Sequence, residues 1–137
     1  MVHGAGCLCG AVRISIAAEP MAARACWCRG CQYLGGGANT VNVCFPADAV
    51  TVTGAIRWHE SIADSGNLMR RAFCPECGTP LISNAVARPH LTFIRAGALD
   101  DPELMAPQNT IWTSAAPSWA CIDPDLPRME GQPAPIA

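Results

Sequence analysis

An all-β domain of many short antiparallel strands is the fold class that this sequence predicts. Short apolar runs alternate with polar residues in the period of two that is typical of half-buried strands. The 12 glycines and 12 prolines among the 137 residues divide these runs into short pieces. No stretch shows the period expected of a covering helical layer. The length suits one domain over residues 1–137 with a hydrophobic core of its own.

The expected strands follow one another along the chain, separated by turn residues. They cover residues 12–16, 41–45, 50–53, 56–59, 81–83, 91–95 and 111–113. Residues 22–26 carry no clear periodic signal, and the glycine run at 35–37 predicts a loop, or less readily a nest of N–H groups for an anion. Residues 100–103 form a turn that could open one short helical turn. The proline-rich tail from about residue 124 is expected to be irregular.

The charge of the chain argues against nucleic-acid binding. Such binding needs a clustered excess of lysine and arginine, whereas the formal net charge here is −2. The N-terminal sequence has neither the basic region nor the apolar stretch of a signal peptide, and no apolar run approaches the ~18 residues of a membrane helix. We therefore expect a cytoplasmic protein without membrane contact, whose nine cysteines stay reduced.

Reduced cysteines in close pairs are typical of metal binding. Cys7 and Cys9 stand at the start of a predicted strand, and Cys74 and Cys77 form a second pair next to a glycine. Together they supply the four thiolates of a closed, structural zinc site. Two alternatives remain: the pairs are unrelated, or a Cys-x-x-Cys pair is redox-active. The second calls for a βαβ pattern that the sequence lacks.

A second group of thiols, Cys26, Cys28 and Cys31, has no obvious fourth ligand. Gly30 permits a tight bend, so that the sulfurs of Cys28 and Cys31 can face one point. If the preceding residues are extended, Cys26 and Cys28 point to the same side. The sequence thus predicts an open zinc site that can accept a ligand from outside, and two zinc ions per chain.

The remaining histidines and cysteines are less informative. Any of His3, His59 and His90 could supply the missing fourth ligand, although isolated histidines are more often surface or hydrogen-bonded residues than metal ligands. Cys44 and Cys121 have no spaced partner, and we expect neither to bind metal.

Four segments taken together resemble the glutathione-dependent formaldehyde-activating enzyme family. They read GCLCGAV at 6–12, CWCRGC at 26–31, FCPECGTPL at 73–81 and AGALDDP at 96–102, and the tail adds PSW at 117–119 and DLP at 125–127. The resemblance implies a zinc-stabilised fold of the β-tent kind. It also implies that the four-cysteine set holds structural zinc and that Cys26, Cys28 and Cys31 hold the zinc of the glutathione site.

The resemblance further implies a carbon–sulfur lyase like S-(hydroxymethyl)glutathione synthase, with glutathione and an aldehyde as substrates. Metal coordination would deprotonate the thiol, and Arg29, Arg70 or Arg71 could bind a glutathione carboxylate through two hydrogen bonds. Nothing in the sequence chooses among these three arginines.

Three positions depart from the family pattern. Trp27 stands where a histidine is common, Gln32 where a basic residue is common, and Asn109 near a frequent histidine. These changes favour, as an alternative, a non-catalytic zinc module that binds a thiol or a protein partner. An open fourth position on the second zinc would favour catalysis, and a filled one would favour a structural role.

Overall fold

Ten strands in two sheets make up nearly all the regular structure of this protein. The computed structural model describes residues 3–136. The smaller sheet has the order β1-β2-β5, formed by β1 (His3–Gly6), β2 (Arg13–Ile16) and β5 (Val50–Thr53). The larger sheet has the order β10-β3-β4-β9-β8-β7-β6, formed by β3 (Ala22–Cys26), β4 (Thr40–Pro46), β6 (Arg57–Ile62), β7 (Leu68–Phe73), β8 (Pro80–Ala85), β9 (Leu91–Arg95) and β10 (Asn109–Ile111). The prediction of an all-β fold is confirmed.

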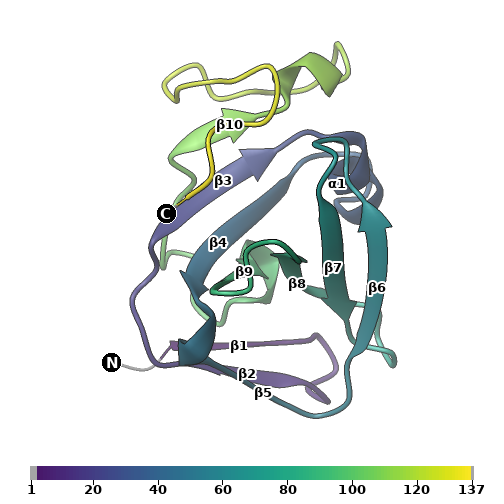
Figure 1. The fold of residues 1–137 in the computed structure, drawn as a ribbon, viewed down its shortest axis with the longest axis vertical. Helices are drawn as coiled ribbons and strands as arrows, with labels where there is room; N and C mark the ends of the chain where they lie inside the picture. The colour runs from purple at the N-terminus through teal and green to yellow at the C-terminus, as the bar shows by residue number, and fades with distance from the viewer. Residues whose placement is uncertain (1–2, 137) are drawn as a thin grey trace.

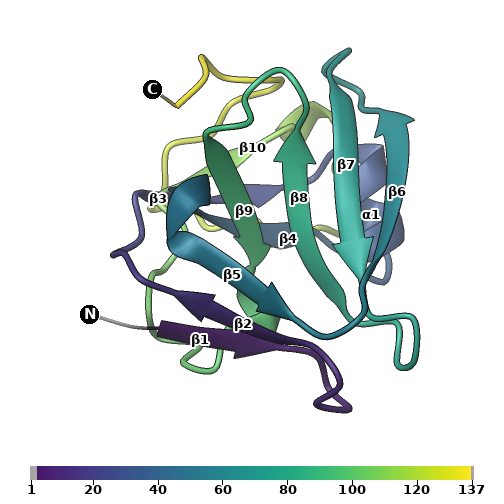
Figure 2. The ribbon, with the colours of Figure 1, turned by 60° about the horizontal axis from the view of Figure 1, so that its bottom comes forward.

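The hydrophobic core lies between the two sheets. Figure 1 shows β1, β2 and β5 below a larger sheet that curves from β10 and β3 to β6, and Figure 2 shows β9, β8, β7 and β6 side by side. Because side chains alternate along a strand, one face of the larger sheet turns its apolar residues toward the smaller sheet. The fully buried side chains of this core include Val12, Ile16, Val43, Phe45, Leu81 and Ile94.

The opposite, concave face of the larger sheet is more polar. Arg24 of β3 pairs in register with Asn42 of β4, and Asn42 pairs with Arg95 of β9. Two strands further along, Arg71 of β7 is opposite Ser83 of β8. These five side chains line the same cavity, so the strand order brings them together from distant parts of the chain.

The predicted strands are all present within a few residues of their expected bounds, but three observed strands were missed. These are β1, β3 and β7. The last predicted strand, at 111–113, lies instead at Asn109–Ile111 and is followed by a 3-10 turn, η3 (Thr113–Ala115). The expectation of purely antiparallel pairing is wrong at this point, because β10 runs parallel to β3.

The sequence also gave no sign of the short helix α1 (Arg29–Leu34). Two further 3-10 turns, η1 (Ala47–Ala49) and η2 (Ala96–Ala98), follow β4 and β9. The glycine run ends α1: the N–H of Gly35 donates to the carbonyl of Cys31, and that of Gly37 donates to the carbonyl of Gln32. These N–H groups are therefore used by the helix, which disfavours the anion nest. Residues 100–103 form a turn without a helix, as an N–H of Glu103 bonds the Asp101 carboxylate.

The tail from residue 124 contains no strand or helix, as predicted, yet its first part is held against β10. The N–H of Thr110 donates to Pro127, and the N–H of Met129 donates back to Thr110. Figure 1 shows the last residues passing beyond β10 and ending near β3. No helix in the described part of the chain is both long and apolar enough to span a membrane.

Candidate metal centres and cavity

The first predicted cysteine set comes together between the turn after β1 and the turn after β7. The sulfurs of Cys7, Cys9, Cys74 and Cys77 all lie within 4.8 Å of one another. Sγ of Cys9 is 3.6 Å from that of Cys7 and 3.8 Å from that of Cys74. A tetrahedral zinc with ~2.3 Å bonds to sulfur requires sulfur separations of ~3.8 Å. The donor set therefore fits zinc.

Backbone and hydroxyl groups around this cluster favour thiolates. The N–H of Val12 donates to Cys7 Sγ at 3.2 Å. The Thr79 hydroxyl lies 3.1 Å from Cys77 Sγ and also accepts the N–H of Leu8, which links the two cysteine turns. Hydrogen bonds from the Thr79 hydroxyl and backbone lower the pKa of Cys77 to about 5. Since metals bind thiolates, this lowered pKa favours metal binding near neutral pH.

The second predicted set also comes together. Cys26 ends β3, Cys28 caps α1 and Cys31 lies in the first turn of that helix, with all three sulfurs within 4.8 Å of one another. Each residue is buried, and the N–H of Cys31 donates to Cys28 Sγ at 3.4 Å. Thiol hydrogen bonds from Cys26 and then Cys28 lower the pKa of Cys31 to about 2, whereas contact with Cys28 and Cys31 raises that of Cys26. Thiols that share protons in this way can exchange them for a divalent cation.

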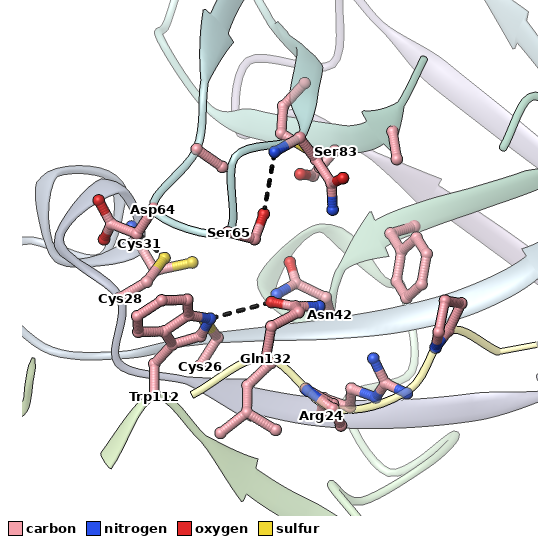
Figure 3. A pocket seen from close by; sticks show the side chains of 18 of the residues that line it. Arg24, Cys26, Cys28, Cys31, Asn42, Asp64, Ser65, Ser83, Trp112 and Gln132 are labelled. Carbon is pink, nitrogen blue, oxygen red and sulfur yellow. Dashed lines mark hydrogen bonds between the residues drawn. The ribbon is translucent and has the colours of Figure 1, made fainter. Parts of the chain in front are cut away.

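The three-cysteine cluster lies at one end of a cavity of about 170 Å³, formed over the concave face of the larger sheet. Figure 3 shows Asp64 and Ser65, from the turn between β6 and β7, above the sulfurs of Cys28 and Cys31, with Trp112 below them. The Asp64 carboxylate accepts the N–H of Arg29 at 2.8 Å, which ties this turn to the start of α1. The C-terminal residues Gln132, Pro133, Pro135 and Ile136 also line the cavity, and Figure 3 shows Gln132 beside Trp112 and Cys26.

Of the three arginines proposed as carboxylate ligands, only Arg71 lines the cavity. Arg29 is exposed, bonds the Gln32 side chain and stacks on Tyr33. Arg70 points to the other side of β7, because successive side chains of a strand alternate, and it pairs with Glu60. The proposals of Arg29 and Arg70 are therefore not supported by their positions.

Other cavity residues were missed by sequence reasoning. They include Arg24, Arg88, Arg95, Asp64, Ser65, Trp112 and the tail residues Gln132, Pro133, Pro135 and Ile136. A signal existed for Arg24, since it stands two residues before Cys26 and must share its face if the segment is a strand. The others depend on strand order and could not be found from local patterns.

None of the three histidines lines the cavity. His3 bonds Glu19 at 3.1 Å, and His59 and His90 are exposed. No described histidine or further cysteine joins the three-cysteine cluster. A metal ion held by these three sulfurs would therefore have its fourth ligand position, on the cavity side, available to a ligand from outside the protein.

None of the three residues that depart from the family pattern lines the cavity. Trp27 is buried and packs edge-on against Trp119. The buried Gln32 side chain donates to the carbonyls of Trp27 and Ala115 and accepts from Arg29. Trp27 and Gln32 are thus placed to hold neighbouring loops together, whereas Asn109 Oδ1 is buried without a hydrogen-bond partner in the described structure.

Cys44 and Cys121 lie outside both clusters, which leads to a prediction. Replacing both by alanine should leave the metal content unchanged, because neither sulfur is near the others. Cys44 is fully buried and Cys121 is exposed, so the free energy of unfolding should fall by only about 1–3 kcal/mol, from the small cavity at Cys44. Metal analysis and denaturant unfolding of the double variant check this, and loss of one metal would contradict it.

Comparison with known proteins shows a family match over most of the chain. Residues 1–115 match the family model described as "Glutathione-dependent formaldehyde-activating enzyme". A crystal structure of a Rhodobacter sphaeroides protein has a similar fold, with a TM-score of 0.58 and 21% identity over 73% of this chain and 92% of that one.

A shorter match involves a mouse protein. Epidermal growth factor receptor kinase substrate 8-like protein 1 from Mus musculus is 39% identical over 56 residues. The match covers 41% of this chain, and the chain spans only 8% of that protein's length.

Proposed function

This chain belongs to the glutathione-dependent formaldehyde-activating enzyme family, and we propose that it joins a glutathione-like thiol to formaldehyde or a related small aldehyde. In this reaction a bond forms between the thiol sulfur and the aldehyde carbon, the carbonyl π bond opens, and the thiol proton ends on the new hydroxyl. The product is a hemithioacetal, which with formaldehyde is an S-(hydroxymethyl) thioether. The reverse reaction breaks the carbon–sulfur bond, so the activity is that of a carbon–sulfur lyase.

The observation that carries this proposal is a three-cysteine cluster that faces a cavity with an open position. Cys26, Cys28 and Cys31 are the residues that would hold zinc there, and the four-cysteine cluster would hold a second, structural zinc. When bound, the zinc at the open cluster supplies a means of deprotonating a substrate thiol near neutral pH. A purely structural metal site would not need a cavity beside it, so the cavity favours a site that binds a ligand. The rate of formaldehyde consumption separates an enzyme from a module that only binds a thiol.

The surrounding side chains have separate tasks in this proposal. Arg71 and Arg95 lie near the cluster: Arg71 is close to Gly30 of α1, and the Arg95 charge acts on Cys31. Both can orient polar groups of the substrate. Asp64 and Ser65, from the turn above the sulfurs, are the side chains in position to pass the thiol proton to the aldehyde oxygen (Figure 3).

The test combines a structural and a kinetic measurement. Zinc-edge X-ray absorption of the zinc-loaded protein should gain one sulfur in the zinc shell when glutathione is added, and formaldehyde should be consumed faster than in the spontaneous reaction. S-methylglutathione, whose sulfur carries no proton, is the control for the added sulfur. Sulfur binding without faster aldehyde consumption would leave a thiol-binding zinc protein. Absence of both effects would remove the proposed function.

A further inference from the structure

The cavity carries an unusual excess of positive charge. Four arginines line it, namely Arg24, Arg71, Arg88 and Arg95. Asp64 is the one acidic residue among the lining residues, and its carboxylate already accepts the N–H of Arg29. The ion pairs within residues 3–136 are His3–Glu19, Arg13–Asp100 and Arg70–Glu60, so no cavity arginine has a carboxylate partner there.

The four arginines divide into two pairs by what they contact. Arg71 donates to the Ser61 hydroxyl at 2.8 Å, and Arg95 donates to Asn42 Oδ1 at 2.5 Å. These two are therefore held by neighbouring strands, and Arg95 is almost completely buried. Arg24 and Arg88 instead donate to the C-terminal segment, Arg24 to the carbonyl of Ala134 at 3.3 Å and Arg88 to the carbonyl of Ile136.

Burial without a carboxylate partner is unfavourable for a guanidinium group. Arg95 is almost completely buried and Arg24 is half-buried, so both guanidinium groups lose part of their hydration. The Nε atoms of Arg71, Arg88 and Arg95 are buried without a hydrogen-bond partner in the described structure. An anion in the cavity would offset the desolvation and accept these free N–H groups.

The segment that contacts Arg24 and Arg88 is weakly attached to the rest of the fold. Up to Gly131 the tail forms backbone hydrogen bonds with residues 110–114. From Gln132 to Ile136, the described hydrogen bonds all come from side chains: Trp112 Nε1 donates to Gln132 Oε1 at 2.9 Å, and the two arginines donate to carbonyls. Pro133 and Pro135 lack an N–H, so they cannot add backbone donors.

We propose that Arg24 and Arg88 form a carboxylate-binding subsite, and that residues 132–136 occupy this subsite with their carbonyl groups until a carboxylate ligand displaces them. A carbonyl is a neutral acceptor, whereas a carboxylate forms charge-assisted hydrogen bonds with arginine that are about twice as strong. The tail is therefore an internal competitor that an anionic substrate can replace. The proposal deepens the proposed function, since it assigns the carboxylate end of the thiol substrate.

The position of Arg24 relative to the cysteines supports this assignment. Arg24 and Cys26 lie two residues apart on β3 and share its cavity face, which separates their Cα atoms by roughly 7 Å. A ligand whose sulfur reaches the cluster can thus place a carboxylate one step along the same strand. Arg24 and Arg88 line the same cavity and donate to carbonyls only two residues apart in the tail, Ala134 and Ile136, so one carboxylate ligand can face both.

The experiment uses S-methylglutathione, which has both carboxylates of glutathione but no thiol. Its binding to the zinc-loaded protein is measured by calorimetry for wild type, Arg24→Gln and Arg88→Gln. Each substitution removes a charged donor and should weaken binding by about 10- to 100-fold. Arg57→Gln, at an exposed position on β6 outside the cavity, is the matched control and should bind like wild type.

The tail is tested by a variant that ends after Gly131. This truncation should bind S-methylglutathione about 3- to 10-fold more tightly, because no carbonyl has to be displaced. In the full chain, the NMR signal of the Trp112 indole N–H should shift on ligand binding as its bond to Gln132 breaks. Gln132→Ala loosens the segment without removing it, so it should also bind S-methylglutathione more tightly than wild type, but by a smaller factor than the truncated variant.

Each part of the proposal can be overturned. Arginine variants that bind S-methylglutathione as tightly as wild type would reject the subsite, as would an equal loss of affinity for 2-mercaptoethanol, a thiol without a carboxylate. A truncated protein that binds no more tightly than wild type would reject the competing tail, and no detectable binding to wild type or to the truncated protein would reject the subsite itself. Failure of the proposed function looks different: glutathione would then add no sulfur to the zinc shell, while the effects on S-methylglutathione would persist.

Discussion

Replacing Cys74 by serine is expected to unfold or aggregate the protein rather than lower its stability slightly. Cys74 and Cys77 follow β7 in the larger sheet, whereas Cys7 and Cys9 follow β1 in the smaller one, so a metal at this cluster joins the two sheets. Structural zinc contributes about 10–16 kcal/mol in small zinc modules, as much as the whole stability of a typical domain. Circular dichroism, soluble yield and zinc content measure the outcome.

The matched control for this variant is Cys44→Ser. Both cysteines are fully buried, and the chemical change is the same, but Cys44 lies outside the two clusters. Cys44→Ser should stay folded with its full metal content and lose only about 1–3 kcal/mol for the buried hydroxyl. A soluble Cys74→Ser protein that keeps its zinc and melts within a few degrees of wild type would contradict the assignment of a structural metal.

The cysteine pattern allowed both clusters to be predicted because metal ligands are read from local spacing. The two pairs and the triplet of thiols each stand next to a turn residue. Such spacing lets the two pairs together, and the triplet by itself, direct their sulfurs toward one metal ion. The structure brings together both predicted sets, the four-cysteine set and the three-cysteine set. The strands with regular alternation, such as residues 91–95, were also predicted because burial on one face leaves a period of two in the sequence.

The missed elements lack such a local signal. β1 reads HGAG and β3 reads AARAC, and small side chains produce little contrast between the two faces of a strand. The helix α1 has six residues, too few to show a helical period, and it is specified by the Cys28 cap and the glycine run after it. The parallel pairing of β10 with β3 joins residues about 85 positions apart in the chain and is set by tertiary contacts.

The same reasoning explains which part of the site escaped prediction. The sequence alone could not show which of the nine arginines line the cavity. A guanidinium lines it only if the strand order places its strand in the cavity wall and its side chain is on the cavity face of that strand. Arg71 faces the cavity and Arg70 faces away, although they are adjacent. Arg24 and Arg95 meet on either side of Asn42 because β4 lies between β3 and β9.

The second large effect is expected at the open cluster, where Cys28→Ser should remove one metal and the thiol-dependent activity while the protein stays folded. The stability of the fold is expected to depend mainly on the four-cysteine cluster, which this substitution leaves intact. Serine also preserves the start of α1, because its hydroxyl can accept the N–H of Cys31 that Cys28 now accepts. Stability and function should therefore separate in this variant.

The measurements for Cys28→Ser are zinc content, thermal melting, zinc-edge absorption with glutathione, and formaldehyde consumption. We expect half the zinc, a melting temperature within several degrees of wild type, no sulfur added to the remaining zinc, and aldehyde loss at the spontaneous rate. Cys121→Ser, at an exposed thiol outside both clusters, is the control and should behave as wild type in all four. Two zinc ions and full activity in Cys28→Ser would contradict the role of this cluster, because a site with two remaining thiolates should neither retain its zinc nor present the substrate thiol to the aldehyde.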